Sequence, residues 1–454
     1  MAHTFTPQDA YALMGELVAQ ATGEKSITVF DTASFVSAGE LVLSTGTENT
    51  LNALSIIMGR TFMAVRPYNA RLNSINAINS GLFTDRIRKI SFYSGKAMPS
   101  GNFNTDLYTN HAYGYDNGTN GATGSTPATN STKDMFEQVP AIPLELNFLG
   151  RDVWQDGISV YEDQVQRALR DESSFISFVS AFMTQKANDI EMQKEAFNRM
   201  TLLSRMALSF AISDSSSAIK GAETAIDMKA AFNAKFGTSY TTAQLLTTYL
   251  KEFTAFFVSF YKTLSDMMTY PSIKYFAAPV KSVGGANHYL LRHTPKDRQK
   301  TIFYNPFWND VKALVLPEVF NDGYLSPDNF NYETVDFWQS YTGKDEVNLK
   351  VTVPGWLESL ITSGSTTTDT SYTANVAHVL AVIFDEDSVM TDFQLENART
   401  SPVEARKGYR TIWYNFAKNA IIDPTERFIC LYLPADPVTD AKDVTEEPKT
   451  SKKK

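Results

Sequence analysis

Residues 172–212 read ESSFISFVSAFMTQKANDIEMQKEAFNRMTLLSRMALSFAI and carry the strongest local signal in the sequence. Their apolar positions recur mainly at steps of three and four, with no proline or glycine among them, and include Phe175, Val179, Phe182, Ala187, Ile190, Phe197, Met200, Leu203, Ala207 and Phe210. This spacing puts them on one face of a helix. A helix of about 35 residues spans about 50 Å, well above the mean globular length. The segment is therefore predicted to be one helix that crosses a whole domain.

Shorter helices are predicted on both sides of this segment. They are expected at residues 9–21, 48–63 and 309–316, and the capping box formed by Thr241 and Gln244 opens another that runs to about Met268. No second segment matches the long helix in length, so a coiled coil is the weaker interpretation of residues 172–212. A polar stretch punctuated by glycine is expected after Phe30.

Runs with a strand pattern are spread along the rest of the chain. They are residues 87–93, 144–148, 289–291, 301–304, 334–338, 348–353, 378–384, 411–416 and 428–433. No repeat period and no proline- or serine-rich linker divides the chain into independent domains. The alternation of strands with helices predicts an α+β fold whose sheet is assembled from distant segments. With 454 residues, the chain is expected to hold two or three interwoven structural units.

A long polar segment lies between the first two predicted strands. Residues 116–132 read DNGTNGATGSTPATNST and contain no aromatic residue and no aliphatic residue larger than alanine. Loops without structure of their own rarely exceed about 12 to 15 residues in compact domains unless they are functional or disordered. We expect a protruding hairpin or Ω-like loop that becomes ordered against neighbouring subunits. Its candidate interface residues are Asn117, Gly118, Gly121, Gly124, Pro127 and Lys133.

The composition excludes several classes of protein. The chain has 41 basic and 50 acidic residues, a net charge of −9, so specific nucleic-acid binding is disfavoured. The N-terminal residues lack an apolar targeting segment and no run approaches about 18 apolar residues, so no membrane association is expected. Cys430 is the single cysteine, which rules out an intrachain disulfide and predicts a buried, inert thiol. Residues 436–454 are expected to be a disordered tail.

The sequence offers little catalytic chemistry. The histidines lack metal-ligand spacing, and no nucleotide-binding or hydrolase motif is present, so no catalytic residue, cofactor or metal is assigned and the chain is predicted not to be an enzyme. The most enzyme-like feature is the carboxylate run Asp385, Glu386 and Asp387, which follows a predicted strand. The favoured interpretation is that these residues cap the first turn of a following short helix.

Residues 292–300, RHTPKDRQK, form a basic run between two predicted strands. An anion or nucleic-acid site is the weaker interpretation in an acidic protein. A solvated turn or a donor of salt bridges between subunits is favoured. Arg292, Lys296 and Arg298 are therefore candidate interface residues.

Four further segments carry a family resemblance: DTASFV at 31–36, GTENTLNA at 46–53, RHTP at 292–295 and VDFWQS at 335–340. They resemble segments of the major capsid proteins of tailed bacteriophages, which have the Hong Kong 97-type coat fold. The order of arm, polar hairpin, long helix, mixed region and returning strands is also similar to that family.

The resemblance implies a domain layout over nearly the whole chain. It places an N-terminal arm with helices at 1–80, an extended loop hairpin at 81–150 and a peripheral domain with the spine helix at 151–220. An axial domain would cover 221–390, and strands at 391–435 would return to the peripheral domain before the tail at 436–454.

The implied function is structural. The chain would self-assemble through hexamers and pentamers into the icosahedral head that encloses a double-stranded DNA genome, with scaffolding, portal and decoration proteins as further partners. It would be found in the virion and assemble in the bacterial cytoplasm. The alternatives are an encapsulin-type nanocompartment shell, a soluble α+β hydrolase using Asp385 and Asp387, and a surface-attachment protein.

Overall fold

The computed structural model describes residues 7–23, 27–45, 72, 75–77, 86–93, 141–149, 152–169, 172–213, 223–283, 286–314, 332–362, 368–404 and 406–436. The helix predicted at 48–63, the polar segment 116–132 and the tail predicted at 436–454, apart from Asp436, lie outside these residues.

The long helix predicted from the sequence is confirmed. It is α6 (Glu172–Ser213) and holds 42 residues, which span about 63 Å at 1.5 Å per residue. The other helices are α1 (Pro7–Thr22), α2 (Thr32–Ser44), α5 (Glu162–Ala168), α7 (Met228–Phe236), α8 (Thr242–Leu246), α9 (Leu250–Met267), α10 (Asn305–Leu314), α11 (Gly355–Thr362) and the 3₁₀ turn η2 (Lys296–Arg298).

In the part of the chain that the structure describes, the strands form two larger sheets and three two-stranded ones. They are β1 (Asn76–Ala77), β2 (Arg86–Phe92), β3 (Pro143–Leu149), β4 (Asp152–Tyr161), β5 (Ala225–Asp227), β6 (Val280–Val283), β7 (Ala286–Tyr289), β8 (Gln299–Tyr304), β9 (Tyr332–Val335), β10 (Val347–Val353), β11 (Thr370–Val376), β12 (His378–Asp385), β13 (Val389–Thr400), β14 (Tyr409–Ile422) and β15 (Phe428–Leu433). The larger sheets have the orders β1-β13-β14-β4 and β5-β15-β12-β8-β9, and β2–β3, β6–β7 and β10–β11 pair separately. The predicted α+β fold, with sheets assembled from distant segments, is confirmed.

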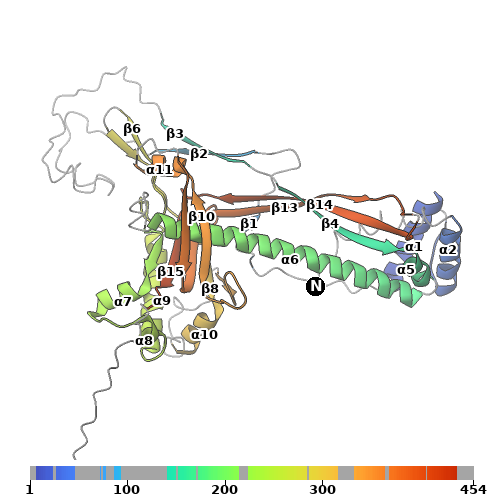
Figure 1. Ribbon diagram of the computed structural model, residues 1–454, viewed down its shortest axis with the longest axis horizontal. Coiled ribbons are helices and arrows are strands. Elements are labelled where there is room, and N and C mark those ends of the chain that lie inside the picture. The colour runs from blue at the N-terminus through green and yellow to red at the C-terminus, as the bar shows by residue number, and fades with distance from the viewer. Residues whose placement is uncertain are drawn as a thin grey trace, which may run out of the picture.

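The molecule is elongated along α6. Figure 1 shows this helix as a shaft, with β13, β14 and β4 beside it. Helices α1, α2 and α5 gather at its N-terminal end, and the five-stranded sheet with α7 to α10 gathers at its C-terminal end. Among the described residues, two main apolar cores are therefore joined by one helix and one long hairpin, with two smaller apolar clusters in addition.

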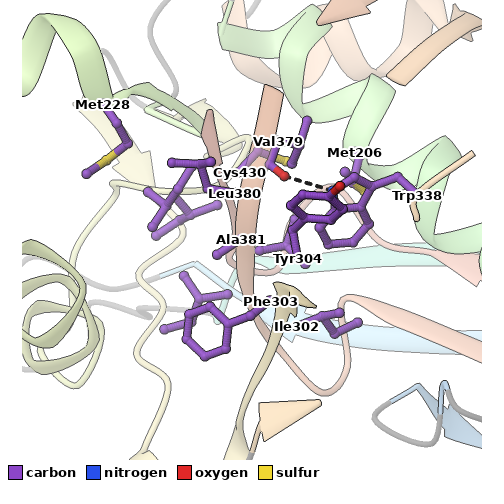
Figure 2. Close-up of a cluster of buried hydrophobic side chains, with 14 of the residues drawn as sticks. Met206, Met228, Ile302, Phe303, Tyr304, Trp338, Val379, Leu380, Ala381 and Cys430 are labelled. Atoms are coloured by element: carbon purple, nitrogen blue, oxygen red, sulfur yellow. Dashed lines mark hydrogen bonds between the residues drawn. The ribbon is translucent and has the colours of Figure 1, made fainter. Parts of the chain in front are cut away.

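The large core surrounds the C-terminal end of α6. Strands β12 and β15 are buried almost throughout, which explains why their sequences are near-continuous apolar runs. The Trp338 indole nitrogen donates a 2.8 Å hydrogen bond to the carbonyl of Val379 (Figure 2). The ring of Phe303 stacks on Trp308 with centroids 4.1 Å apart. Cys430 is fully buried in this core, as predicted.

The small core covers the N-terminal end of α6. Phe175 of α6 meets Phe35 of α2 with ring centroids 5.4 Å apart, and both side chains are buried. Helix α1 and strand β14 complete this core, with Met14 and Ile412 among its buried residues. The N-terminal helices therefore cap one end of the shaft.

Between the two cores, polar side chains join α6 to the sheet. Lys186 of α6, which is almost completely buried, forms an ion pair with Asp156 of β4. Further along the helix, Thr391 donates a 2.8 Å hydrogen bond to the side-chain oxygen of Asn198, and both residues are buried. The middle of the shaft is thus held by specific polar contacts rather than by apolar packing.

Helix α2 was not predicted from the sequence. Asp31 caps it, because its carboxylate accepts a 2.7 Å bond from the amide of Ser34 while the Ser34 hydroxyl accepts from the amide of Asp31. The polar stretch punctuated by glycine that was expected after Phe30 is therefore wrong: Gly39 lies inside α2, where it lets the helix backbone approach Leu169 closely. A Cβ there would lie 2.9 Å from the carbonyl oxygen of Leu169.

The single helix predicted from Thr241 to Met268 is in fact two. Its capping box is confirmed, but α8 ends at Leu246 and α9 starts at Leu250. The Thr247 hydroxyl donates to the carbonyl of Ala243, an alternative to helical backbone bonding that β-branched threonine favours. Smaller differences affect α10, which starts earlier than predicted, and strands β7 and β9, which end before residues 291 and 338.

Candidate subunit interface

The predicted interface residues divide into two groups. Asn117, Gly118, Gly121, Gly124, Pro127 and Lys133 lie outside the described residues. Arg292, Lys296 and Arg298 lie between β7 and the start of β8, where each makes contacts within its own chain.

Arg298 holds the carboxylate run that follows β12. Its guanidinium lies 3.1 Å from a carboxylate oxygen of Glu386 and also pairs with Asp387 and Asp385. Burial lowers the pKa of Arg298, but its bonds and charges with these acids outweigh that effect and raise it. The predicted helix cap is wrong: the run forms a tight turn between β12 and β13, closed by the bond from the Ser388 amide to the Asp385 carbonyl.

Lys296 and Arg292 also bind their own subunit. The ammonium of Lys296 lies 2.7 Å from the Asp266 carboxylate and 2.7 Å from the Ser265 hydroxyl, at the last turn of α9. Arg292 donates to the Ser91 hydroxyl at 2.9 Å and pairs with Glu426 at 3.0 Å. Arg292, Lys296 and Arg298 are thus paired within their own chain. A role for these residues in contacts between subunits stays a prediction.

The β2–β3 hairpin presents two different faces. Its inner face carries Tyr93, Leu144 and Leu146, which pack with Leu290. On its outer face Ile90 is 49% and Phe92 is 59% exposed. Because side chains alternate along a strand, this outer face combines the two apolar side chains with the exposed ion pair of Arg88 and Glu145, while the other face is docked.

An anchor of buried charges fixes this hairpin to the body. Lys89 of β2 reaches Asp423 and Glu426, in the turn between β14 and β15. Burial lowers the pKa of Lys89, but the charges of both carboxylates raise it above its usual value overall. Burial also raises the pKa of Glu426, against the opposing effects of Lys89 and Arg292.

A second exposed apolar surface lies on the face of the β4–β14 pair that points away from α6. Tyr161 and Tyr409 are cross-strand partners with ring centroids 5.6 Å apart. Trp413 is 43% exposed and covers Gly157, where a Cβ would come within 2.8 Å of the indole ring. Val153 extends the surface, and β4 is the last strand of this sheet in the described residues.

A third exposed surface is on the middle of α6. Met192 is 54% and Met200 is 61% exposed, and the exposed Ala196 lies between them. Residues four apart share a face of a helix. Methionine adapts its shape to irregular partners, which suits a contact surface.

Within the described part of the chain, no cluster of His, Cys, Asp and Glu is arranged to hold a metal ion. Burial raises the pKa of the Cys430 thiol, which makes it unreactive. His378 Nδ1 lies 2.6 Å from Asp345 Oδ2, and this bond raises the pKa of the imidazole. No helix among the described residues has the length and apolarity that a membrane crossing requires.

No protein-family model and no curated protein matches the sequence. Solved structures do match. A chain in the capsid structure of Staphylococcus phage Andhra is 10% identical at a TM-score of 0.47, with 81% of this chain and 84% of that chain covered. A chain in the capsid structure of cyanophage P-SCSP1u is 10% identical at a TM-score of 0.38, with 80% of this chain and 86% of that chain covered. A chain in the capsid of Myoviridae phage XM1 is 8% identical at a TM-score of 0.36, with 80% of this chain and 92% of that chain covered. All three are structures of bacteriophage capsids.

Proposed function

We propose that this chain is a major capsid protein, a structural subunit that self-assembles through hexamers and pentamers into the head enclosing the double-stranded DNA genome of a tailed bacteriophage. The observation that carries this proposal is the distribution of exposed apolar surface over an elongated subunit. The hairpin, the β4–β14 face and the middle of α6 each expose large apolar side chains. Such surfaces usually mark contacts with other proteins.

Several different surfaces on one subunit suit a closed shell. A shell of many copies repeats heterologous contacts, in which one surface of a subunit meets a different surface of its neighbour. The outer face of the β2–β3 hairpin and the exposed face of the β4–β14 pair belong to different sheets. The first surface of one copy can therefore contact the second surface of a neighbouring copy.

The charge pattern suits a shell protein that does not bind the enclosed DNA tightly. The chain is acidic overall, and Arg292, Lys296 and Arg298 form ion pairs with carboxylates of the same chain. Protein groups that bind DNA phosphates release counterions and make binding tight. A subunit that does not bind DNA phosphates tightly would leave a packaged genome mobile.

We propose the domain layout given by the resemblance: an arm at 1–80, an extended loop at 81–150, a peripheral domain at 151–220, an axial domain at 221–390, returning strands at 391–435 and a tail. The pairing of β14 with β4 beside α6 supports the return. Within the last strands β15 pairs with β12, so the returning segment contacts both sheets. Scaffolding, portal and decoration proteins, and assembly in the bacterial cytoplasm, belong to the same proposal.

The test is to express the full chain alone and examine it by sedimentation and negative-stain microscopy. We expect hexamers, pentamers or closed shells. The double variant Ile90→Glu, Phe92→Glu should remain dissociated, because charges would be buried at the contact. Tyr341→Glu is the matched control, since Tyr341 is 78% exposed but lies outside the three surfaces. A wild-type chain that stays monomeric at high concentration, alone and with virion components, would refute the proposal.

The content of particles made in infected cells separates the two shell functions. Double-stranded DNA inside them supports a phage head. Packaged enzyme without DNA would instead assign the chain to a nanocompartment.

A further inference from the structure

The anchor of the β2–β3 hairpin places an amine directly on two buried carboxylates. Lys89 Nζ lies 2.5 Å from Asp423 Oδ2 and 2.6 Å from Glu426 Oε1. The Asp423 side chain is completely buried and that of Glu426 is 8% exposed. Lys89 is far from both in the sequence, 334 positions from Asp423 and 337 from Glu426.

The two oxygens of Asp423 have different surroundings. Oδ2 faces the amine of Lys89, whereas Oδ1 accepts a 2.8 Å bond from the Thr425 amide and a 2.6 Å bond from the Thr425 hydroxyl. Two donors aimed at one oxygen stabilise negative charge that develops there when a nucleophile attacks the carbonyl carbon. Thr425 is itself fully buried, so water does not compete for these bonds.

We propose that Lys89 and Asp423 react to form an amide bond within the chain, with Glu426 as the proton carrier. Glu426 takes a proton from the Lys89 ammonium and passes it to Asp423 Oδ2. The neutral amine then attacks Asp423 Cγ, and Oδ1 carries the charge of the tetrahedral intermediate between its two donors. The nitrogen loses a second proton through Glu426 to Oδ2, the Cγ–Oδ2 bond breaks, and water leaves. An ammonium and a carboxylate thus become an amide and one water molecule, with no oxidant or other reactant.

Glu426 is equipped to move these protons. Arg292 lies 3.0 Å from its Oε1 and keeps the carboxylate beside Lys89. Burial raises the pKa of Glu426, whereas for Lys89 burial is outweighed by the two carboxylates, which raise its pKa; the ammonium therefore gives up its proton rarely, and the reaction is expected to be slow. Arg205 and Arg427 are the other charged side chains that act on this group of residues.

A second lysine–aspartate pair, in which one partner is buried and the other is partly exposed as in the first, serves as an internal control. Lys186 and Asp156 are also in contact, and Lys186 is 3% exposed. Asp156 also accepts a hydrogen bond from the side-chain amide of Gln193 at 3.4 Å, and no ion pair is found between Lys186 and a second carboxylate among the described residues. Without a proton carrier, this pair is expected to remain an ion pair.

The test is the mass of the intact, denatured full-length chain, followed by peptide mapping. The wild type should be lighter than its sequence by one water molecule. A protease digest should contain one branched peptide that joins Lys89 to Asp423, and Lys186 should be free. Lys89→Arg, Asp423→Ala and Glu426→Gln should each give the unmodified mass. Lys186→Arg should still lose one water.

Two results would overturn the proposal. One is a folded wild-type chain of unmodified mass after prolonged incubation. The other is a water loss that maps to a single linear peptide, as a cyclic imide would give. The measurement is made on denatured chains, so its outcome is independent of whether particles form. If the variants fail to fold, the wild-type mass and its peptide map decide alone.

Discussion

The two ends of α6 are buried in different ways. From Arg205 to Ile212 every residue is buried, so the C-terminal end passes through the large core and contacts it on all sides. At the N-terminal end Phe175, Val179 and Ile190 are buried, while Ser173, Ser174 and Ser177 are exposed. One end is thus part of a domain interior, and the other is a support on which α1 and α2 pack.

The two ends of α6 are also stabilised by different kinds of element, strands at one end and mainly helices at the other. The large core draws on strands β8, β12 and β15, whose pairing joins segments far apart in the sequence. The small core depends on helices from the first part of the chain, with β14 and β4 closing it. We expect the large core to unfold with the whole molecule and the small core to open locally.

The largest predicted effect tests that difference directly. Phe303→Ala removes a fully buried ring stacked on Trp308, and Phe175→Ala removes a buried ring packed on Phe35. Each should cost about 3 to 5 kcal/mol of local stability. Amide hydrogen exchange should show lost protection throughout the five-stranded sheet for Phe303→Ala. For Phe175→Ala the loss should be confined to α1, α2 and the first turns of α6. Equal loss everywhere in both variants would contradict two separate cores.

A smaller effect is predicted for the polar middle of the shaft. Lys186→Met leaves Asp156 without its partner, and we expect a loss of about 2 kcal/mol, below that of a fully buried pair because Asp156 is 24% exposed. The double variant Lys186→Met, Asp156→Val should recover most of this loss. Denaturant titration measures both. A double variant no better than the single one would show that the pair is needed for more than charge balance.

The next smaller loss of stability is predicted for the N-cap of α8, which lies in the large core. Thr241→Ala removes the acceptor for the Gln244 amide, so α8 should lose about 1 kcal/mol. The control is Thr263→Ala, on the exposed side of α9, which should change stability by less than about 0.5 kcal/mol. Thermal unfolding followed by circular dichroism compares the two. Equal shifts in both variants would mean that the capping box contributes nothing.

The smallest effect concerns the cap at the other end, and it depends on pH. The Ser34 side-chain and backbone bonds lower the pKa of Asp31 below its usual value. A lowered pKa means that the stabilisation is complete above the unfolded value of about 3.9 and is lost as the pH falls through the folded value. Exchange of the α2 amides should therefore speed up in acid beyond its normal pH dependence. Asp31→Asn, a neutral cap, should abolish this extra change, and an unaltered pH response would contradict the assignment.

The sequence predicted the parts of this comparison that have a local pattern. The spacing of Val179, Ile190 and Leu203 indicated α6, and the pair Thr241 and Gln244 indicated the start of α8. Helix α2 was missed because a glycine that permits close packing looks the same in sequence as one that breaks a helix.

The contacts between distant segments had no local signal. Nothing near Lys89 in the sequence points to Asp423, because the two are brought together by the docking of a hairpin on a turn. The same holds for Lys186 and Asp156, which pair across a helix and a strand. The sequence predicted Arg292 as a donor of salt bridges between subunits; the described contact is with Glu426 in its own chain, and the contact between subunits stays a prediction.

The parallel course of α6 and the β13–β14 hairpin fixes one dimension of the subunit. A helix advances about 1.5 Å per residue and a strand about 3.3 Å, so the two run side by side with unequal numbers of residues. Inserting four residues would lengthen the helix by about 6 Å and leave the hairpin unchanged, which would pull one core out of line. Relatives of this chain should therefore vary in the lengths of their loops but keep the lengths of α6 and of the β13–β14 hairpin.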